Sequence, residues 1–68
     1  MEMIPVDSDA IDAIGHDGHN LYVRWNSSGK THRHDNVPQG VAEQMLAASS
    51  KGHYHAKHIR AQYPGKPV

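Results

Sequence analysis

Histidine is the most frequent residue type in this sequence that could perform chemistry. The 68-residue chain has seven histidines and no cysteine. His32 and His34 would share one face of a strand, and His55 and His58 would lie within one helical turn. Imidazole binds zinc, nickel or copper, but a catalytic zinc needs three protein ligands, and no HExxH spacing is present. We therefore expect half-buried or surface histidines, with no metal and no cofactor.

The serines and aspartates suggest no catalytic centre either. The serine pairs at 27–28 and 49–50 lie in expected turns or helix caps, where hydroxyl groups usually bond the backbone. The stretch GHDG at 15–18 is a turn rather than a phosphate-binding loop. Because so short a chain is not expected to enclose an obvious pocket, we predict a protein that is not an enzyme.

Charge is distributed unevenly along a chain that has no net charge. Residues 1–20 contain five acids and no Lys or Arg, whereas residues 21–68 contain seven Lys or Arg and two acids. An anionic partner would be attracted to the second part. If Arg24 and Arg33 are neighbours across two strands, their like charges favour a bound anion. Tyr22 on the same face could stack on the bases of single-stranded RNA.

The strongest strand pattern is LYVRWN at 21–26, in which apolar and polar residues alternate. Gly29 can supply the positive φ of a tight hairpin, and AIDAI at 10–14 predicts a strand before it. A two-residue turn at 28–29 would set the register and place His32 and His34 on the core side. That register pairs Trp25 with His32, Val23 with His34 and Arg24 with Arg33.

Two helices are expected in the second half of the chain. Pro38 suits a first helical turn, and Val41, Met45 and Ala48 recur at helical spacing beside Leu46. Ser49 and Ser50 can cap a second helix, which Pro64 ends. Its expected apolar face contains Gly52, Ala56, Ile59 and Tyr63.

The sequence therefore predicts one α+β domain over residues 1–68. A three-stranded antiparallel meander would be followed by two C-terminal helices packed on one face (β-β-β-α-α). Residues 1–5 and 64–68 are expected to be frayed tails. The expected centre of the thin core consists of Trp25, Val23, Leu21, Ile14, Val41, Met45 and Ile59.

The stretches IDAIGHD, LYVRWNSSG, HRHDNVPQGV and ASSKGHYHAKHIRAQYP together resemble a KTSC domain. This module is named for the C-terminus of some lysyl-tRNA synthetases and also occurs as a free-standing bacterial or phage protein. The resemblance spans residues 6–64 and implies the fold and a suggested RNA-binding role, without a catalytic signature. The family typically has Tyr-x-Tyr where this chain has His32-Arg-His34, and aromatic residues at the positions of His16 and His55. Imidazole rings thus replace other planar rings, and burial of His32 and His34 is expected to lower their pKa values.

Two hypotheses about function follow. The first is a non-enzymatic module that binds RNA or another nucleic acid through a basic surface made of Tyr22, Arg24, Arg33, Lys57 and Arg60. The alternative is a protein–protein interaction module, for which small size, a thin core and an open sheet edge would favour association. No segment has the ~20 apolar residues of a membrane span, and residues 1–12 do not resemble a signal peptide, so no membrane partner and a cytoplasmic location are expected.

Overall fold

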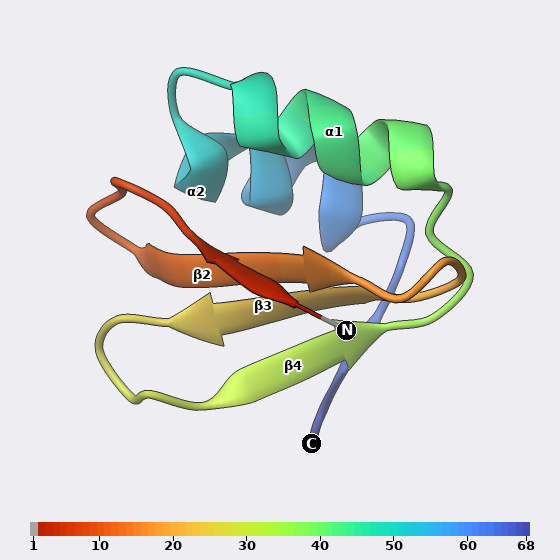
Figure 1. Cartoon of the computed structure of the whole chain (residues 1–68), viewed down its shortest axis with the longest axis horizontal. Helices are drawn as coiled ribbons and strands as arrows, with labels where there is room; N and C mark the ends of the chain where they lie inside the picture. The colour runs from red at the N-terminus through yellow and green to blue at the C-terminus, as the bar shows by residue number, and fades with distance from the viewer. Residues whose placement is uncertain (1) are drawn as a thin grey trace.

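A computed structural model describes residues 2–68 and arranges them in two layers, with helices over one face of an antiparallel sheet (Figure 1). None of the helices in these residues is long and apolar enough to cross a membrane. The α+β class with helices on one face is confirmed. In chain order the elements are β1 (Met3–Pro5), β2 (Ile11–His16), β3 (Leu21–Trp25), β4 (Thr31–His34), α1 (Gln39–Ala47), α2 (Lys51–Tyr54), the π-helix η1 (His55–Ile59) and β5 (Gly65–Pro67).

The sheet has five strands in the order β1-β2-β3-β4-β5, so the expected three-stranded meander is only partly right. The additional strands, β1 and β5, form the two edges and come from the segments that we expected to be frayed. Each is three residues long and ends in a proline, Pro5 or Pro67. Proline is tolerated at a sheet edge because its missing N–H can face solvent.

The register between β3 and β4 differs from the expected one by two residues. Trp25 and Lys30 close the turn through a 3.0 Å bond, so the loop has four residues, 26–29, instead of two. Val23 now lies opposite His32, and Leu21 lies opposite His34. Because side chains alternate with a period of two, this shift leaves both histidines on the core side, as predicted.

The same shift separates the two arginines that were expected to face each other. Arg24 lies opposite Thr31, and Arg33 lies opposite Tyr22. Arg24 and Arg33 are therefore not direct cross-strand neighbours, and the expectation that their repulsion favours a bound anion is wrong.

The core lies between the sheet and the helices. Five residues expected at its centre are fully buried, whereas Trp25 and Val41 are half-buried and pack at its margin. In the last helix the widened π turn buries His55 with Ile59 and leaves Ala56 exposed, contrary to the apolar face that regular helical spacing predicted. The buried hydrophobic residues are Ile11, Ala13, Ile14, Leu21, Val23, Val37, Ala42, Met45 and Ile59.

Histidine rings occupy core positions and are held by hydrogen bonds. His34 and His55 are 2% and 5% exposed, and their Nε2 atoms are 3.1 Å apart. His34 Nδ1 lies 2.6 Å from the carbonyl oxygen of Tyr63. Because a carbonyl only accepts, His34 carries its proton on Nδ1, and its Nε2 accepts from Nε2–H of His55. This arrangement connects β4, η1 and the segment before β5.

A part-buried histidine holds the segment before α1 in a similar way. His16 Nε2 bonds the carbonyl oxygen of Val37, while its Nδ1 accepts a 3.1 Å bond from the backbone N–H of Gly18. Both ring nitrogens of the neutral imidazole are thus used. His16 thus links the end of β2 to the segment that leads into α1.

Gly65 packs directly against the ring of His34. A Cβ atom added at Gly65 would lie 2.7 Å from Cε1 of His34, which two hydrogen bonds hold in place. We predict that Gly65→Ala lowers the free energy of unfolding by about 1–2 kcal/mol, as overpacking does in other cores. Urea denaturation at pH 7.5 measures this change.

Gly40→Ala is the matched control, since a Cβ atom at this helical position would meet nothing within 4 Å. We expect it to leave stability unchanged or to raise it by up to about 1 kcal/mol. Equal urea midpoints for the two variants would contradict the proposed contact between Gly65 and His34.

Stability should also depend on pH through His55. Burial, followed by the electrostatic effects of His34, Arg60 and His32, lowers the pKa of His55 from 6.5 to about 4. The unfolded chain therefore binds more protons between these values, so stability is complete above about pH 6.5 and is lost as pH falls toward 4. We predict a loss of up to about 2 kcal/mol between pH 7.5 and 5, measured by urea denaturation.

His55→Phe should reduce this pH dependence because it keeps a ring and removes the titrating group. His53→Gln, at an exposed position of the same helical region, should leave it unchanged. The role assigned to His55 would be wrong if the wild-type chain had the same free energy of unfolding at both pH values.

Candidate nucleic-acid interface

The helices lie over one face of the sheet and leave the opposite face uncovered (Figure 1). We call this surface the outer face and define it by Tyr22, Arg24, Thr31, Arg33 and Lys66. The register places Tyr22 beside Arg33, and Arg33 beside Lys66, in one row across three strands. Gly15 precedes Tyr22 in that row and presents no side chain beside the ring. Three of the five predicted interface residues therefore lie together.

The β3–β4 hairpin positions these side chains through strand alternation. Leu21 and Val23 point into the core, so Tyr22 and Arg24 between them point outward. In β4 the same rule places Arg33 outward between two inward histidines. The sequence HRH thus contributes rings to the core and a guanidinium group to the outer face.

The cations of the outer face have acidic partners within the chain. Arg24 Nε lies 2.7 Å from Asp12, and Arg33 Nε lies 2.8 Å from Asp35. Lys66 Nζ lies 3.7 Å from the second carboxylate oxygen of Asp35. The arginine side chains remain 40% and 36% exposed, so these ion pairs are solvated and contribute little to stability. A ligand phosphate could replace the carboxylates.

The hydroxyl group of Tyr22 also has a partner, in the turn between β2 and β3. It donates a 3.2 Å bond to Asp17, whose other carboxylate oxygen accepts from the backbone N–H groups of His19 and Asn20. These two backbone hydrogen bonds are the main reason why the pKa of Asp17 is lowered to about 2. The hydrogen bond restrains the ring of Tyr22 at the end of the row.

The other two predicted interface residues lie elsewhere. Lys57 and Arg60 belong to the helical layer on the opposite side of the sheet, and they line two separate hollows there. A strand of RNA lying across Tyr22 would not contact them. The expectation of one continuous basic surface is therefore wrong, because the helices pack on the core side of the sheet, whereas Tyr22, Arg24 and Arg33 point away from it.

Sequence reasoning missed Lys66 and the acidic partners. Lys66 falls in a segment that proline and glycine made look frayed, although it pairs with β4. Asp12 approaches Arg24 at a β-bulge in β2, where the pairing shifts between Ile11 and Ala13. Alternation alone could have placed Asp12 near the outer face, but not opposite a particular arginine.

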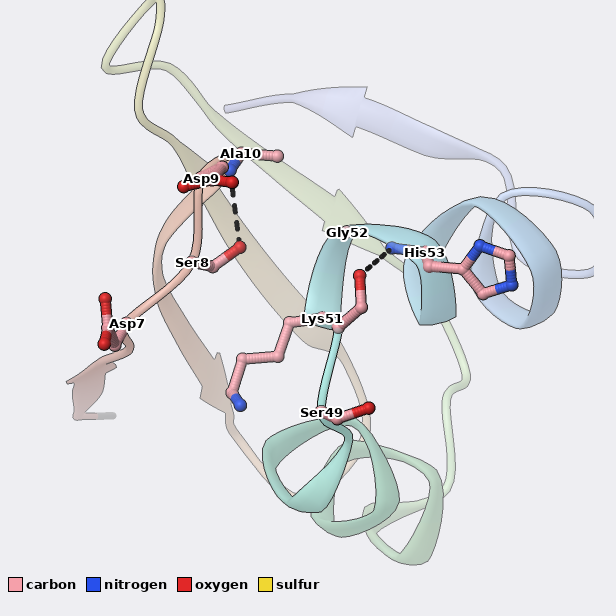
Figure 2. A pocket seen from close by; sticks show the side chains of 9 residues that line it. Asp7, Ser8, Asp9, Ala10, Ser49, Lys51, Gly52 and His53 are labelled. Atoms are coloured by element: carbon pink, nitrogen blue, oxygen red, sulfur yellow. Dashed lines mark hydrogen bonds between the residues drawn. The ribbon is translucent and has the colours of Figure 1, made fainter.

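A hollow of about 620 Å³ lies between the β1–β2 loop and the start of α2. Figure 2 shows Asp7, Ser8 and Asp9 on one side and Lys51 and His53 on the other. Two of its serines bond the local backbone: Ser8 accepts from Ala10, and Ser50 caps α2 by accepting from His53. Lys51 Nζ donates to the carbonyl oxygen of Ala48. The side chains of Ser8, Ser50 and Lys51 therefore hold the local backbone on the two sides of this hollow.

The histidines that suggested a metal site lie apart or bond to other groups. Across residues 2–68, no three His, Asp or Glu side chains form a group that could hold a metal ion. His32 Nδ1 lies 2.9 Å from the indole nitrogen of Trp25, which can only donate, and both ring nitrogens of His34 are engaged. In His32 and His34 these hydrogen bonds use the ring lone pairs that a metal would need.

Comparison with known proteins agrees with the resemblance seen in the sequence. The KTSC domain profile matches residues 7–63, which is most of the chain. A crystal structure of a KTSC domain protein from Yersinia pestis superimposes with a TM-score of 0.90 at 25% identity, covering 98% of this chain and 96% of that one. A comparison with curated proteins gives no significant match. On the profile match and the shared fold, this chain belongs to the KTSC domain family.

Proposed function

We propose that this KTSC domain is a non-enzymatic module that binds single-stranded RNA across its outer face. The observation that carries the proposal is the position of Tyr22, in the middle strand and on the uncovered face of the sheet, with Arg33 directly beside it. Proteins that read single-stranded RNA on a sheet stack bases on aromatic side chains and contact phosphates with nearby cations. Arg24 and Lys66 provide two further cations on the same face.

The composition of the outer face favours RNA over an apolar protein partner. Stable protein interfaces usually have an apolar, aromatic-rich centre. In residues 2–68 the large hydrophobic side chains that are exposed are Ile4 and Val68, which lie on or beside the two edge strands. The centre of the face instead has a tyrosine and guanidinium groups. The protein-interaction module remains the alternative that the experiments below would favour if RNA fails to bind.

Titration of the 15N-labelled chain with a ten-nucleotide oligouridine should shift the resonances of Tyr22, Arg24 and Arg33. Affinity should fall steeply as salt rises, because phosphate contacts release counterions. Tyr22→Ala should weaken binding by about tenfold, the size of one lost stacking contact. Lys57→Gln, on the other side of the sheet, should change affinity by less than about twofold and serves as the control. Binding that is absent, or insensitive to salt, would favour the protein-interaction alternative.

The acidic partners of the cations give a second test, in which a substitution should strengthen RNA binding. Asp35→Asn removes the carboxylate that competes with phosphate for both Arg33 and Lys66. We therefore predict tighter RNA binding, by about threefold or more at low salt, together with little change in stability. Fluorescence anisotropy of a labelled oligouridine measures the affinity, and urea denaturation measures the stability. Weaker RNA binding by a stably folded Asp35→Asn variant would contradict the proposed phosphate contacts.

A further inference from the structure

The hollow that Arg60 lines is on the helical side of the sheet, away from the outer face. We call it the inner hollow; its volume is about 260 Å³. It lies where the end of β3 and strand β4 meet η1 and the start of β5. Its size is below that of pockets for drug-sized ligands, which suits a ligand with a single ring. The residues that line it are Trp25, His32, His34, His55, Arg60 and Gly65.

The walls of the inner hollow are ring faces and edges. Trp25 and His55 meet edge to face with ring centroids 4.8 Å apart, and His34 packs against His55 at 4.9 Å. Planar rings pack well against such surfaces in offset or edge-to-face geometry. The shape and lining therefore favour an aromatic ligand over a flexible aliphatic one.

Arg60 gives the inner hollow its charge. The chain has three arginines, of which Arg24 and Arg33 form ion pairs. Within residues 2–68, no carboxylate lies within 4 Å of Arg60, and none lines the inner hollow. A guanidinium group without an acidic partner, next to an apolar hollow, favours an anionic ligand and in particular a carboxylate.

The hydrogen-bond network fixes which ring nitrogens a ligand would meet. The indole N–H of Trp25 donates to Nδ1 of His32, so the neutral ring of His32 carries its proton on Nε2. The proton on Nε2 of His55 is directed to His34, which leaves Nδ1 of His55 as an acceptor. No side-chain nitrogen or oxygen in residues 2–68 is both buried and without a partner. Because no hydrogen bond is found for Nδ1 of His55, this atom keeps access to solvent.

We propose that the inner hollow binds a small aromatic carboxylate, with the ring against Trp25 and His55 and the carboxylate at Arg60. The Nε2–H group of His32 supplies a second donor to the carboxylate. This site is independent of the proposed RNA interface, because the two surfaces lie on opposite sides of the sheet. The carboxylate would also offset the positive field of Arg60 at His55, which is one cause of the lowered pKa of that ring.

Benzoate is a suitable probe, and Trp25 reports its binding because it is the chain's single tryptophan. At pH 7.5, titration of the wild-type chain should give a saturable change in tryptophan fluorescence with a Kd on the order of 1–10 mM. The amide resonances of Trp25, His32 and Gly65 should shift with the same Kd. Acetate, which lacks the ring, and benzyl alcohol, which lacks the charge, should bind at least about tenfold more weakly.

Arg60→Gln should weaken benzoate binding by about tenfold, as expected for a lost charge-assisted hydrogen bond. Lys57→Gln removes an equal charge from the same helical segment outside the inner hollow and should leave the Kd within about twofold. Three results would overturn the proposal: no saturation with benzoate, equal weakening by the two variants, or equal affinity for benzyl alcohol. Shifts at Tyr22 and Arg33 in place of Trp25 would also overturn it, since they would place the anion on the outer face. Failure of RNA binding would not affect this test.

Discussion

The fold depends on the hydrogen-bonded packing of His34 at the junction of sheet and helices. This ring contacts the carbonyl oxygen of Tyr63, the ring of His55 and the backbone of Gly65. The chain contains no phenylalanine and one tryptophan, so few large apolar side chains are available to fill the space. Imidazole rings fill it instead, but each brings polar atoms that require partners when buried. Satisfying those atoms fixes how β4, η1 and β5 approach one another.

The same constraint explains the sequence His32-Arg33-His34. Strand β4 is shared by both surfaces of the sheet, and alternate residues serve each of them. Arg33 takes part in the row with Tyr22 and Lys66, while the flanking histidines contribute to the core and the inner hollow. A change in register by one residue would exchange these roles and place a guanidinium group in the core. The pairing of Leu21 with His34 therefore keeps the histidines on the core side of the sheet and Arg33 on the outer face.

Patterns in the sequence predicted those features that depend on nearby residues. The alternation in residues 21–25, the proline at the start of α1 and the cap at Ser50 led to the correct elements. Features that depend on distant contacts could not be predicted in this way. Strand β5 exists because residues 65–67 meet β4 after the helices have crossed the sheet, although its glycine and proline resemble a frayed tail.

The residues of the candidate site likewise include some that local patterns predicted and others that depend on distant contacts. The outward direction of Tyr22, Arg24 and Arg33 follows from alternation, so these residues were placed together correctly. Arg60 was assigned to the same surface because its charge, and not its surroundings, was visible in the sequence. Its position beside Trp25 results from the π turn and from the packing of η1. Likewise, the ion pair between Asp12 and Arg24 needs a bulge that no local pattern specifies.

The prolines at the ends of the edge strands limit the pairing of this sheet with strands from other molecules. An exposed edge is a template on which a strand from another molecule can form hydrogen bonds, which is the first step toward amyloid-like growth. Here each edge offers only three residues, and Pro5 and Pro67 have no N–H group to donate. Continuous pairing with a second copy would be interrupted at both sides. A domain with so small a core unfolds locally more readily than a large one, and proline-terminated edges let it do so without starting an aggregate.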